Sequence, residues 1–168
     1  MRKNVAYLLL IGLLLASIAS VAIADLKPGV KAPTFALPTA DGKTFTLKHP
    51  GKVIFLDIWA TWCPPCRAEI PHIIRLSKKY AGKDVVFVGV SVDQKKADVT
   101  KFIKDKGINY PIALDPGGRV VGQPYQLRGI PVTYIIDQKG VIRHVHSGFG
   151  GQADADKMDK EIAALLAK

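Results

Sequence analysis

The most informative run of residues is WATWCPPCRAEIP, residues 59–71, which contains the only two cysteines of the 168-residue chain. Cys63 and Cys66 have the spacing C-x-x-C. The apolar run 53–56 precedes them and a helix-like pattern follows, which places the pair where a buried strand turns into a helix. A structural zinc site takes four ligands, and no second cysteine pair exists to complete one. The spacing at this turn therefore predicts a dithiol/disulfide redox couple.

The start of a helix favours a reactive thiolate at Cys63. Unpaired N–H groups of the first turn and the positive end of the helix dipole both stabilise negative charge. Pro64 suits the first helical position, because its ring fixes φ and its missing N–H would be unpaired there anyway. Pro65 is tolerated for a similar reason, and the two prolines remove two donors from the neighbourhood of the sulfur. We therefore predict a thiolate that is less stabilised than in a C-G-P-C site, and a couple that leans towards reductant.

The run DIWATWCPPCRAEIP, residues 57–71, resembles the active-site segment of the thioredoxin superfamily. More narrowly, it is similar to the TlpA/ResA-like thiol–disulfide oxidoreductases, and the similarity extends from about Gly29 to Gly148. The resemblance implies an α/β thioredoxin-like fold, in which a central mixed sheet is flanked by helices and preceded by an N-terminal β-hairpin extension. It also implies that the Cys63 thiolate attacks a substrate disulfide, and that Cys66 then resolves the mixed disulfide.

The order of the predicted elements also indicates an α/β fold with a mixed sheet. The nearly continuous apolar runs 53–59 and 85–92 are typical of strands that are buried on both faces. A helix is predicted over about 64–80, and Asp93 can cap the next one. The other predicted elements are a hairpin (34–37 and 43–47), a short strand (110–114), a second hairpin (132–136 and 141–147) and a last helix with Ala155, Met158, Ile162, Leu165 and Leu166 on one face.

The N-terminus predicts export of the protein. Residues 1–4 form a short basic region, and residues 5–24 carry no charge and end in an A-x-A-like cleavage signal. The same uncharged stretch is long enough to remain as a membrane anchor. Either outcome places the protein in the periplasm or at the extracytoplasmic face of the membrane. Residues 25–33 are interpreted as a linker and residues 34–168 as one thioredoxin-like domain, which we expect to be monomeric.

The charge pattern excludes some classes of partner. The chain has a net charge of +10, but its lysines are scattered and no basic cluster is interleaved with aromatic residues. We therefore expect a solvated basic surface and no nucleic-acid binding. No cofactor or metal is expected. His144 and His146 lie two apart on a predicted strand and face the same side, but no third ligand is evident nearby, which favours a solvent-facing pair.

Two acidic residues are candidates for handling protons. Asp57 lies alone in an apolar run, where burial would raise the pKa of its carboxyl as a proton acceptor for Cys66 requires. A partly solvated aspartate near a strand end is the alternative. Thioredoxins have aspartate at the matching position, whereas TlpA/ResA-like proteins often have asparagine. Glu69 lies one helical turn after Cys66; the resemblance implies that it tunes the thiols, while its position is equally typical of a solvated residue.

The resemblance also identifies residues that contact the substrate. Thioredoxin-like folds place a cis-proline opposite the dithiol, and Pro131 is at the matching position. The backbone of Ile130, which precedes it, is then expected to pair with the bound substrate. Trp62 is expected to form an apolar platform beside the reactive sulfur, with core packing as the equal alternative. Pro64 and Pro65 complete the predicted substrate surface.

The sequence as a whole predicts an extracytoplasmic thiol–disulfide oxidoreductase. The resemblance implies protein disulfides as substrates, such as those of apocytochrome c, and a membrane thiol carrier as electron donor. A thiol peroxidase is a second interpretation, but peroxiredoxins have proline and threonine at the positions occupied here by Leu56 and Ala60. A third interpretation is a non-catalytic copper or zinc carrier that uses both cysteines and a histidine.

Overall fold

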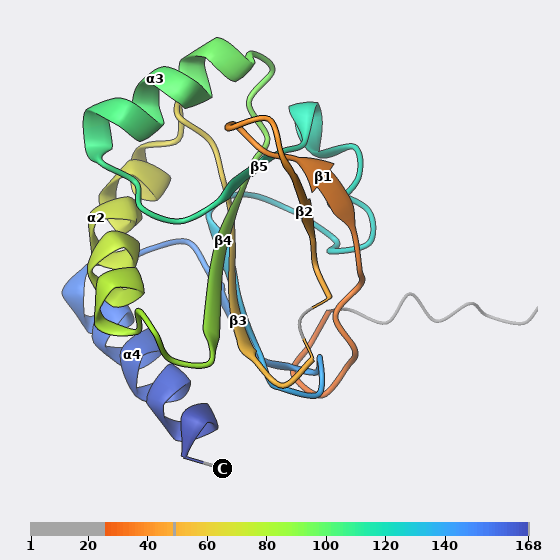
Figure 1. Ribbon diagram of the computed structural model, residues 1–168, viewed down its shortest axis with the longest axis vertical. Coiled ribbons are helices and arrows are strands. Elements are labelled where there is room, and N and C mark those ends of the chain that lie inside the picture. Colours follow the sequence, from red (N-terminus) through yellow and green to blue (C-terminus); the bar gives the residue numbers. More distant parts are fainter. Residues whose placement is uncertain (1–25, 49, 168) are drawn as a thin grey trace, which may run out of the picture.

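The structure is a computed structural model that describes residues 26–48 and 50–167. Its centre is a five-stranded mixed sheet with the strand order β5-β4-β3-β6-β7, accompanied by a separate β1-β2 hairpin (Figure 1). The strands are β1 (Ala36–Pro38), β2 (Thr44–Thr46), β3 (Val53–Trp59), β4 (Val85–Ser91), β5 (Ile112–Leu114), β6 (Val132–Ile136) and β7 (Ile142–Ser147), and the helices are α2 (Pro64–Lys79), α3 (Lys96–Lys106) and α4 (Gln152–Leu166). This arrangement confirms the predicted mixed sheet and the N-terminal hairpin.

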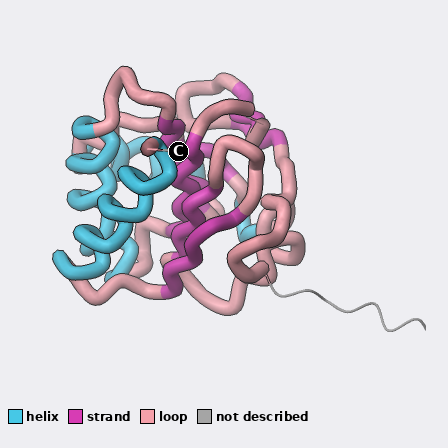
Figure 2. Tube along the Cα trace, turned by 90° about the horizontal axis from the view of Figure 1, so that it is seen from below, coloured by secondary structure: helices cyan, strands magenta, loops and turns pink. Residues whose placement is uncertain are grey.

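Strand β3 occupies the middle of the sheet, and all seven of its residues are buried. It pairs in parallel with β4 and antiparallel with β6. Helices α2 and α3 connect β3 to β4 and β4 to β5, so both crossovers step in the same direction along the sheet. Since such crossovers are right-handed, both helices must lie on the same face, where α4 joins them (Figures 1 and 2). The start of α2 therefore lies at the end of the most buried strand.

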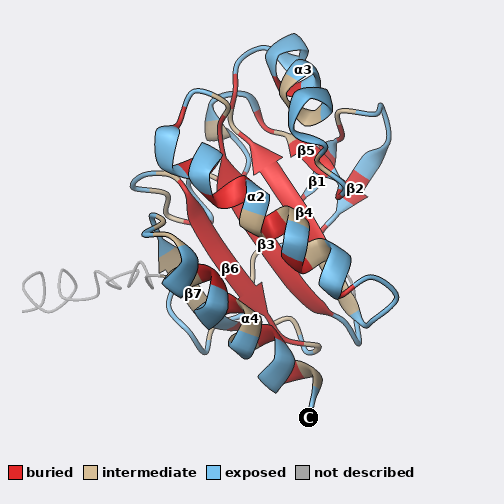
Figure 3. Ribbon diagram, turned by 90° about the vertical axis from the view of Figure 1, so that its left-hand side faces the viewer, coloured by how far each residue is buried: buried red, intermediate tan, exposed pale blue. Residues whose placement is uncertain are grey.

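Each face of the sheet has its own hydrophobic core. On one face, helices α2 and α4 cover the buried strands (Figure 3), and this core includes Phe55, Ile70 and Ile162. On the other face, the β1-β2 hairpin and the chain before β6 pack through Phe35 and Tyr125. Both cysteines belong to the helix-side core, so the dithiol lies at the edge of well-packed structure.

The segment interpreted as a linker is bonded to the sheet where the structure describes it. The N–H of Gly29 donates to the carbonyl oxygen of Ile142 over 2.8 Å, and the N–H of Ala32 donates to that of Gly140 over 3.0 Å. The predicted leader, residues 1–24, lies outside the described residues. Among residues 26–48 and 50–167, no helix is long and apolar enough to cross a membrane.

The prediction that Asp93 caps a helix is wrong. Helix α3 has Lys95 at its N-cap, which makes no capping bond through its side chain. The buried carboxylate of Asp93 instead accepts bonds from the N–H and the hydroxyl of Thr61, over 2.9 and 2.6 Å, and from the hydroxyl of Ser91 over 2.8 Å. Asp93 therefore fastens the turn that leads to Cys63.

The prediction of a solvent-facing histidine pair is also wrong. His146 Nε2 lies 2.6 Å from one carboxylate oxygen of Glu161, and His144 Nδ1 lies 3.2 Å from the other. The His146 side chain is only 9% exposed, because this face of β7 is covered by helix α4. In the part of the chain that the structure describes, no group of three or more His, Cys, Asp or Glu residues could hold a metal ion.

Candidate active site

The two cysteines lie at the start of helix α2, as the sequence predicted. Cys63 is the N-cap residue with an extended backbone, and Pro64 and Pro65 occupy the first helical positions. A disulfide joins Cys63 to Cys66. The N–H of Cys66 donates to the sulfur of Cys63 over 3.2 Å. Because neither proline has an N–H to offer, this bond is the backbone contact that stabilises negative charge on Cys63.

The sulfurs are covered, while the residues around them are open to solvent. Cys63 is 3% exposed and Cys66 is 1% exposed. Trp62 is 66% exposed, which rules out the alternative that it packs in the core, and Pro64 and Pro65 are exposed as well. An apolar surface therefore surrounds a recessed sulfur, and a partner that reaches Cys63 must contact this surface.

The peptide bond between Ile130 and Pro131 is cis, which confirms the expected cis-proline. The carbonyl oxygen of Ile130 lies 3.7 Å from the sulfur of Cys63. Within the described residues, no backbone–backbone hydrogen bond uses the N–H of Ile130. An extended polypeptide next to Cys63 would thus find a backbone donor at Ile130, in the place where the resemblance puts substrate docking.

Asp57 is buried in the middle of β3, between Thr133 on β6 and Gly89 on β4. It is 1% exposed, and neither carboxylate oxygen has a hydrogen-bond partner among the described residues. Burial, helped by the nearby carboxyl of Glu69, raises the pKa of Asp57 well above its ordinary value. The alternative of a partly solvated aspartate is therefore wrong.

Glu69 is 1% exposed, so the interpretation as a solvated glutamate is wrong too. Its position three residues after Cys66 puts it on the helix face that packs on the sheet. One carboxylate oxygen accepts a bond from the hydroxyl of Thr133 over 2.9 Å. Burial raises the pKa of Glu69 to about 7; the Thr133 hydroxyl opposes this increase, and the carboxylate of Asp154 adds to it.

Sequence reasoning missed two polar residues close to this site. Thr133 could have been found, because residues two apart on a strand face the same side and Thr133 follows the cis-proline at that spacing. Tyr110 gave no local signal. It is buried in the same core as the cysteines, and its hydroxyl has no partner among the described residues. Burial, together with the carboxyls of Asp57 and Glu69, raises the pKa of its phenol.

Comparisons with known proteins agree with this geometry. The family model described as Redoxin matches residues 27–162. The chain belongs to the Redoxin family. Over 126 residues it is 38% identical to the thioredoxin-like protein YneN of Bacillus subtilis, with 73% of each chain covered. Over 115 residues it is 34% identical to the thiol–disulfide oxidoreductase ResA of Bacillus cereus, with 68% of this chain and 66% of ResA covered.

A solved structure extends the similarity to the fold of this Redoxin chain. The crystal structure of a Chlorobium tepidum protein assigned as the thiol:disulfide interchange protein DsbE superposes with a TM-score of 0.78. The two sequences are 36% identical, and the match covers 84% of this chain and 99% of that one. The thioredoxin-like fold is therefore confirmed. With the paired cysteines at the helix start, these relatives make the chain a thiol–disulfide oxidoreductase of the ResA/DsbE type.

Proposed function

We propose that the protein is an extracytoplasmic thiol–disulfide reductase that acts on disulfides of exported proteins. The observation that carries the proposal is the position of Cys63, which has one backbone donor at its sulfur and an apolar surface around it. Because few hydrogen-bond donors surround the sulfur, the thiolate of Cys63 is only weakly stabilised. A weakly stabilised thiolate makes the reduced protein a better electron donor. Support for exported substrates comes from the predicted leader and the similarity to ResA.

The reaction needs no cofactor. The Cys63 thiolate attacks one sulfur of the client disulfide; that bond breaks, a Cys63–client disulfide forms, and the other client sulfur leaves as a thiolate that takes up a proton. The Cys66 thiolate then attacks the sulfur of Cys63, which forms the Cys63–Cys66 disulfide and releases the second client thiolate. Two electrons have passed to the client. The structure shows the oxidised product, which an external dithiol donor must reduce again.

Asp57 and Glu69 are the proposed proton acceptors for Cys66. A thiol must lose its proton before it attacks, and a buried carboxylate with a raised pKa can receive one near neutral pH. The pKa of Glu69, about 7, matches this task. Burial raises the pKa of Asp57 well above its ordinary value, and no described group donates a bond to its carboxyl. We assign the proton exchange to Glu69, whose carboxyl in turn helps to raise the pKa of Asp57.

The proposed docking surface combines Trp62, Pro64 and Pro65 with the cis-proline segment. A hollow of about 390 Å³ lies beside Trp62, and Ile130 forms part of its lining. When a client cysteine lies at Cys63, the residues next to it would therefore contact Trp62, and its backbone would pair with that of Ile130. Apocytochrome c is the client that the resemblance suggests, and a membrane thiol carrier is the suggested donor.

The decisive experiment is the reduction potential of the Cys63–Cys66 couple, measured by equilibration with glutathione or dithiothreitol. For a reductase we expect a potential below about −200 mV, on the thioredoxin side of protein disulfide isomerase. A value near about −120 mV, which is typical of a strong oxidant, would reverse the proposed direction. In parallel, the reduced protein should reduce the disulfides of insulin, and Cys63→Ala should abolish this activity. Cys66→Ala should instead accumulate the mixed disulfide with its client.

A further inference from the structure

Buried polar groups without a partner are concentrated in the core that contains the dithiol. Among the residues that the structure describes, five buried side-chain nitrogen or oxygen atoms have no hydrogen-bond partner, and all five belong to Asp57, Trp59, Glu69 and Tyr110. Trp59 and Tyr110 lie in the same core as the cysteines. Asp57 shares a face of β3 with Trp59, because residues two apart on a strand point the same way. An unpartnered buried polar group is costly, so each of these groups requires an explanation.

Strand β4 separates Asp57 from Tyr110 only by a glycine. Gly89 is the Cα partner of Asp57 on one side and of Ile112 on the other. Its N–H also donates to the carbonyl oxygen of Pro111 over 3.0 Å, so the segment that carries Tyr110 runs alongside Gly89. Tyr110 and Ile112 both belong to the helix-side core. Because Gly89 has no side chain, none stands at this position of β4 between the Tyr110 segment and Asp57.

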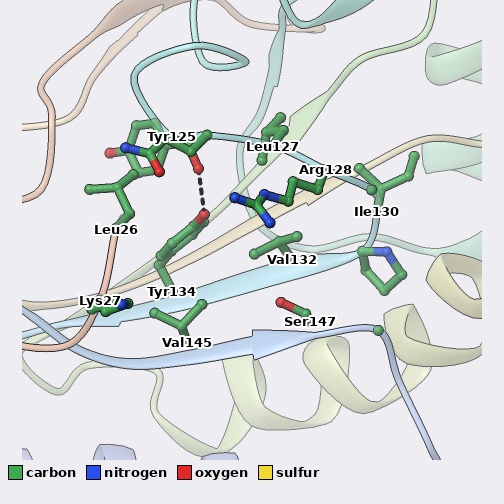
Figure 4. A pocket seen from close by; sticks show the side chains of 14 residues that line it. Leu26, Lys27, Tyr125, Leu127, Arg128, Ile130, Val132, Tyr134, Val145 and Ser147 are labelled. Carbon is green, nitrogen blue, oxygen red and sulfur yellow. Dashed lines mark hydrogen bonds between the residues drawn. The ribbon is translucent and has the colours of Figure 1, made fainter. Parts of the chain in front are cut away.

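The hydroxyl of Tyr110 differs from those of the other tyrosines that the structure describes. The Tyr80 hydroxyl donates to a carboxylate oxygen of Asp159 over 2.7 Å. On the opposite face of the sheet, beside a hollow of about 520 Å³, the Tyr134 hydroxyl donates to the carbonyl oxygen of Tyr125 over 2.9 Å (Figure 4). The Tyr125 hydroxyl donates to another carbonyl oxygen over 2.6 Å. A phenylalanine in place of Tyr110 would fill the same space without an unpartnered hydroxyl, so packing does not account for this group.

The carboxyl pair of Asp57 and Glu69 has too few donors for an ionised state. The polar and titratable groups in and around the pair come from four elements: Asp57 of β3, Glu69 of α2, Thr133 of β6 and Asp154 of α4. Helix α3 adds only apolar contacts to this core, through Phe102 and Ile103. The Thr133 hydroxyl donates to one of the four carboxyl oxygens, and the other three have no partner among the described residues. A buried carboxylate needs more donors than this to hold its charge.

The phenol of Tyr110 is a suitable donor for this pair. Burial raises the pKa of Tyr110, and the carboxyls of Asp57 and Glu69 add to the increase, so the phenol keeps its proton over the range in which the carboxyls titrate. The hydroxyl hydrogen rotates freely, and a carboxyl group turns about a soft terminal torsion. A hydrogen bond between them can therefore form when charge appears, without movement of the backbone.

We infer that Tyr110 is a positioning residue for proton transfer at the dithiol, because its hydroxyl supplies a hydrogen bond to the carboxyl pair of Asp57 and Glu69 when the pair ionises. A donor to the ionised form keeps Glu69 able to accept a proton. In the reduced protein that proton moves from the Cys66 sulfur to the Glu69 carboxylate, and the Cys66 thiolate then attacks Cys63. The inference rests on the proposed function, since it takes Glu69 as the proton acceptor, and it adds the group that sets the pH at which Glu69 can act.

The test compares Tyr110→Phe with the matched variant Tyr80→Phe, which removes a hydroxyl from the same core but from a group bonded to Asp159. Infrared difference spectra of the oxidised protein, recorded over a range of pH, follow the C=O stretch of protonated carboxyl groups, and Glu69→Gln identifies the band of Glu69. We expect the midpoint of this band to rise by about one pH unit in Tyr110→Phe and to stay unchanged in Tyr80→Phe.

The same shift should appear in disulfide exchange. Reduction of dithiobis(nitrobenzoate) in a single turnover releases one thionitrobenzoate when Cys63 attacks and a second when Cys66 attacks. The pH profile of the second release should move up by about one pH unit in Tyr110→Phe, so that its rate well below the midpoint falls about tenfold. A residue that only fills space would change the amplitude or the stability and leave this midpoint in place.

Urea unfolding at about pH 5, where Glu69 with its pKa of about 7 is protonated, provides a second measurement. Tyr110→Phe should unfold at a urea concentration at least as high as the wild type, because it removes an unpartnered hydroxyl, whereas Tyr80→Phe should unfold at a lower one. A lower value for Tyr110→Phe would overturn the inference, as would an unchanged infrared midpoint or an equal displacement in Tyr80→Phe. A reduction potential typical of an oxidant would instead refute the proposed direction of electron flow and leave the infrared result unaffected.

Discussion

The hydroxyl of Thr133 donates a hydrogen bond over 2.9 Å to a carboxylate oxygen of Glu69. This contact joins the helix that carries the cysteines to the strand that follows the cis-proline. Glu69 lies three residues after Cys66, and Thr133 lies two residues after Pro131. The group proposed to exchange a proton with the dithiol is thus held by the same strand that presents the docking segment, so the charge of Glu69 depends on the position of β6.

Replacement of Thr133 by valine should shift the pH dependence of disulfide exchange to higher pH. The hydroxyl lowers the pKa of Glu69, so its loss should raise that pKa above the value of about 7. The measurement is the pH profile of single-turnover reduction of dithiobis(nitrobenzoate). Thr133→Ser retains the donor and should restore the wild-type profile. A profile that is equally displaced in both variants would indicate a packing effect and contradict the role of the hydrogen bond.

The free energy of unfolding of the oxidised protein should contain a component that is complete below pH 4.5 and is lost as pH rises through about 7. The pKa of Glu69 rises from 4.5 to about 7 on folding, so the folded state binds more protons in this range and loses stability on ionisation. At about 1.4 kcal/mol per pH unit, the full loss is about 3 kcal/mol. Asp57, whose pKa is also raised, adds a loss of the same sign.

This component should be measured as the difference between wild type and Glu69→Gln in urea unfolding at several pH values. Taking this difference cancels the contributions of His72 and His144, whose pKa values are lowered by burial and which therefore act with the opposite sign. The free energy of unfolding of Glu69→Gln should increase relative to that of the wild type as pH rises. The exposed variant Asp105→Asn should show no such trend. A constant difference between Glu69→Gln and wild type would show that Glu69 does not titrate in this range.

The elements and the dithiol could be predicted from the sequence because both depend on local patterns. A continuous apolar run indicates a buried strand, and a proline shortly after it is typical of the first position of a helix. Asp93 and Glu69 were harder, because their environments come from tertiary contacts. The carboxylate of Asp93 accepts a hydrogen bond from Thr61, 32 residues earlier in the chain, and does not cap the helix that begins next to it. Glu69 is buried because α2 packs on the sheet, which its position in an early turn of the helix does not reveal.

The histidine pair shows the same limit on another strand. The spacing correctly placed His144 and His146 on one face of β7, because side chains two apart on a strand point the same way. It could not show what covers that face. The covering element is α4, which follows β7 in the chain and returns over its surface, so that the carboxylate of Glu161 meets both rings. The contact therefore depends on how a later helix packs, which the strand pattern does not contain.

Removal of the Asp93 carboxylate should destabilise the protein by about 2–4 kcal/mol, since three donors would lose a charged, buried acceptor. The measurement is the free energy of unfolding of Asp93→Ala in urea. Asp98→Ala is the control, because Asp98 is exposed in the first turn of α3 and should contribute at most about 1 kcal/mol through the helix dipole. Equal losses in the two variants would contradict the anchoring role of Asp93.

A methyl group at Gly89 should also destabilise the fold. A Cβ there would lie 2.7 Å from a side-chain carbon of Ile112 and 2.8 Å from the indole nitrogen of Trp59, which is fully buried. We expect Gly89→Ala to cost about 1–3 kcal/mol in thermal or urea unfolding. At Gly129 a Cβ would meet nothing within 4 Å, so Gly129→Ala is the matched control. A loss as large at Gly129 as at Gly89 would show that crowding is not the cause.

Replacement of Trp62 by alanine should separate client binding from stability. The side chain is 66% exposed, so its removal should change the free energy of unfolding by less than about 0.5 kcal/mol. A client that covers the indole would lose an aromatic contact, and we expect kcat/KM for insulin reduction to fall about tenfold. Val120 is the other large exposed hydrophobic residue among those described, and Val120→Ala should leave that rate within about twofold. Equal rates for Trp62→Ala and wild type would remove Trp62 from the docking surface.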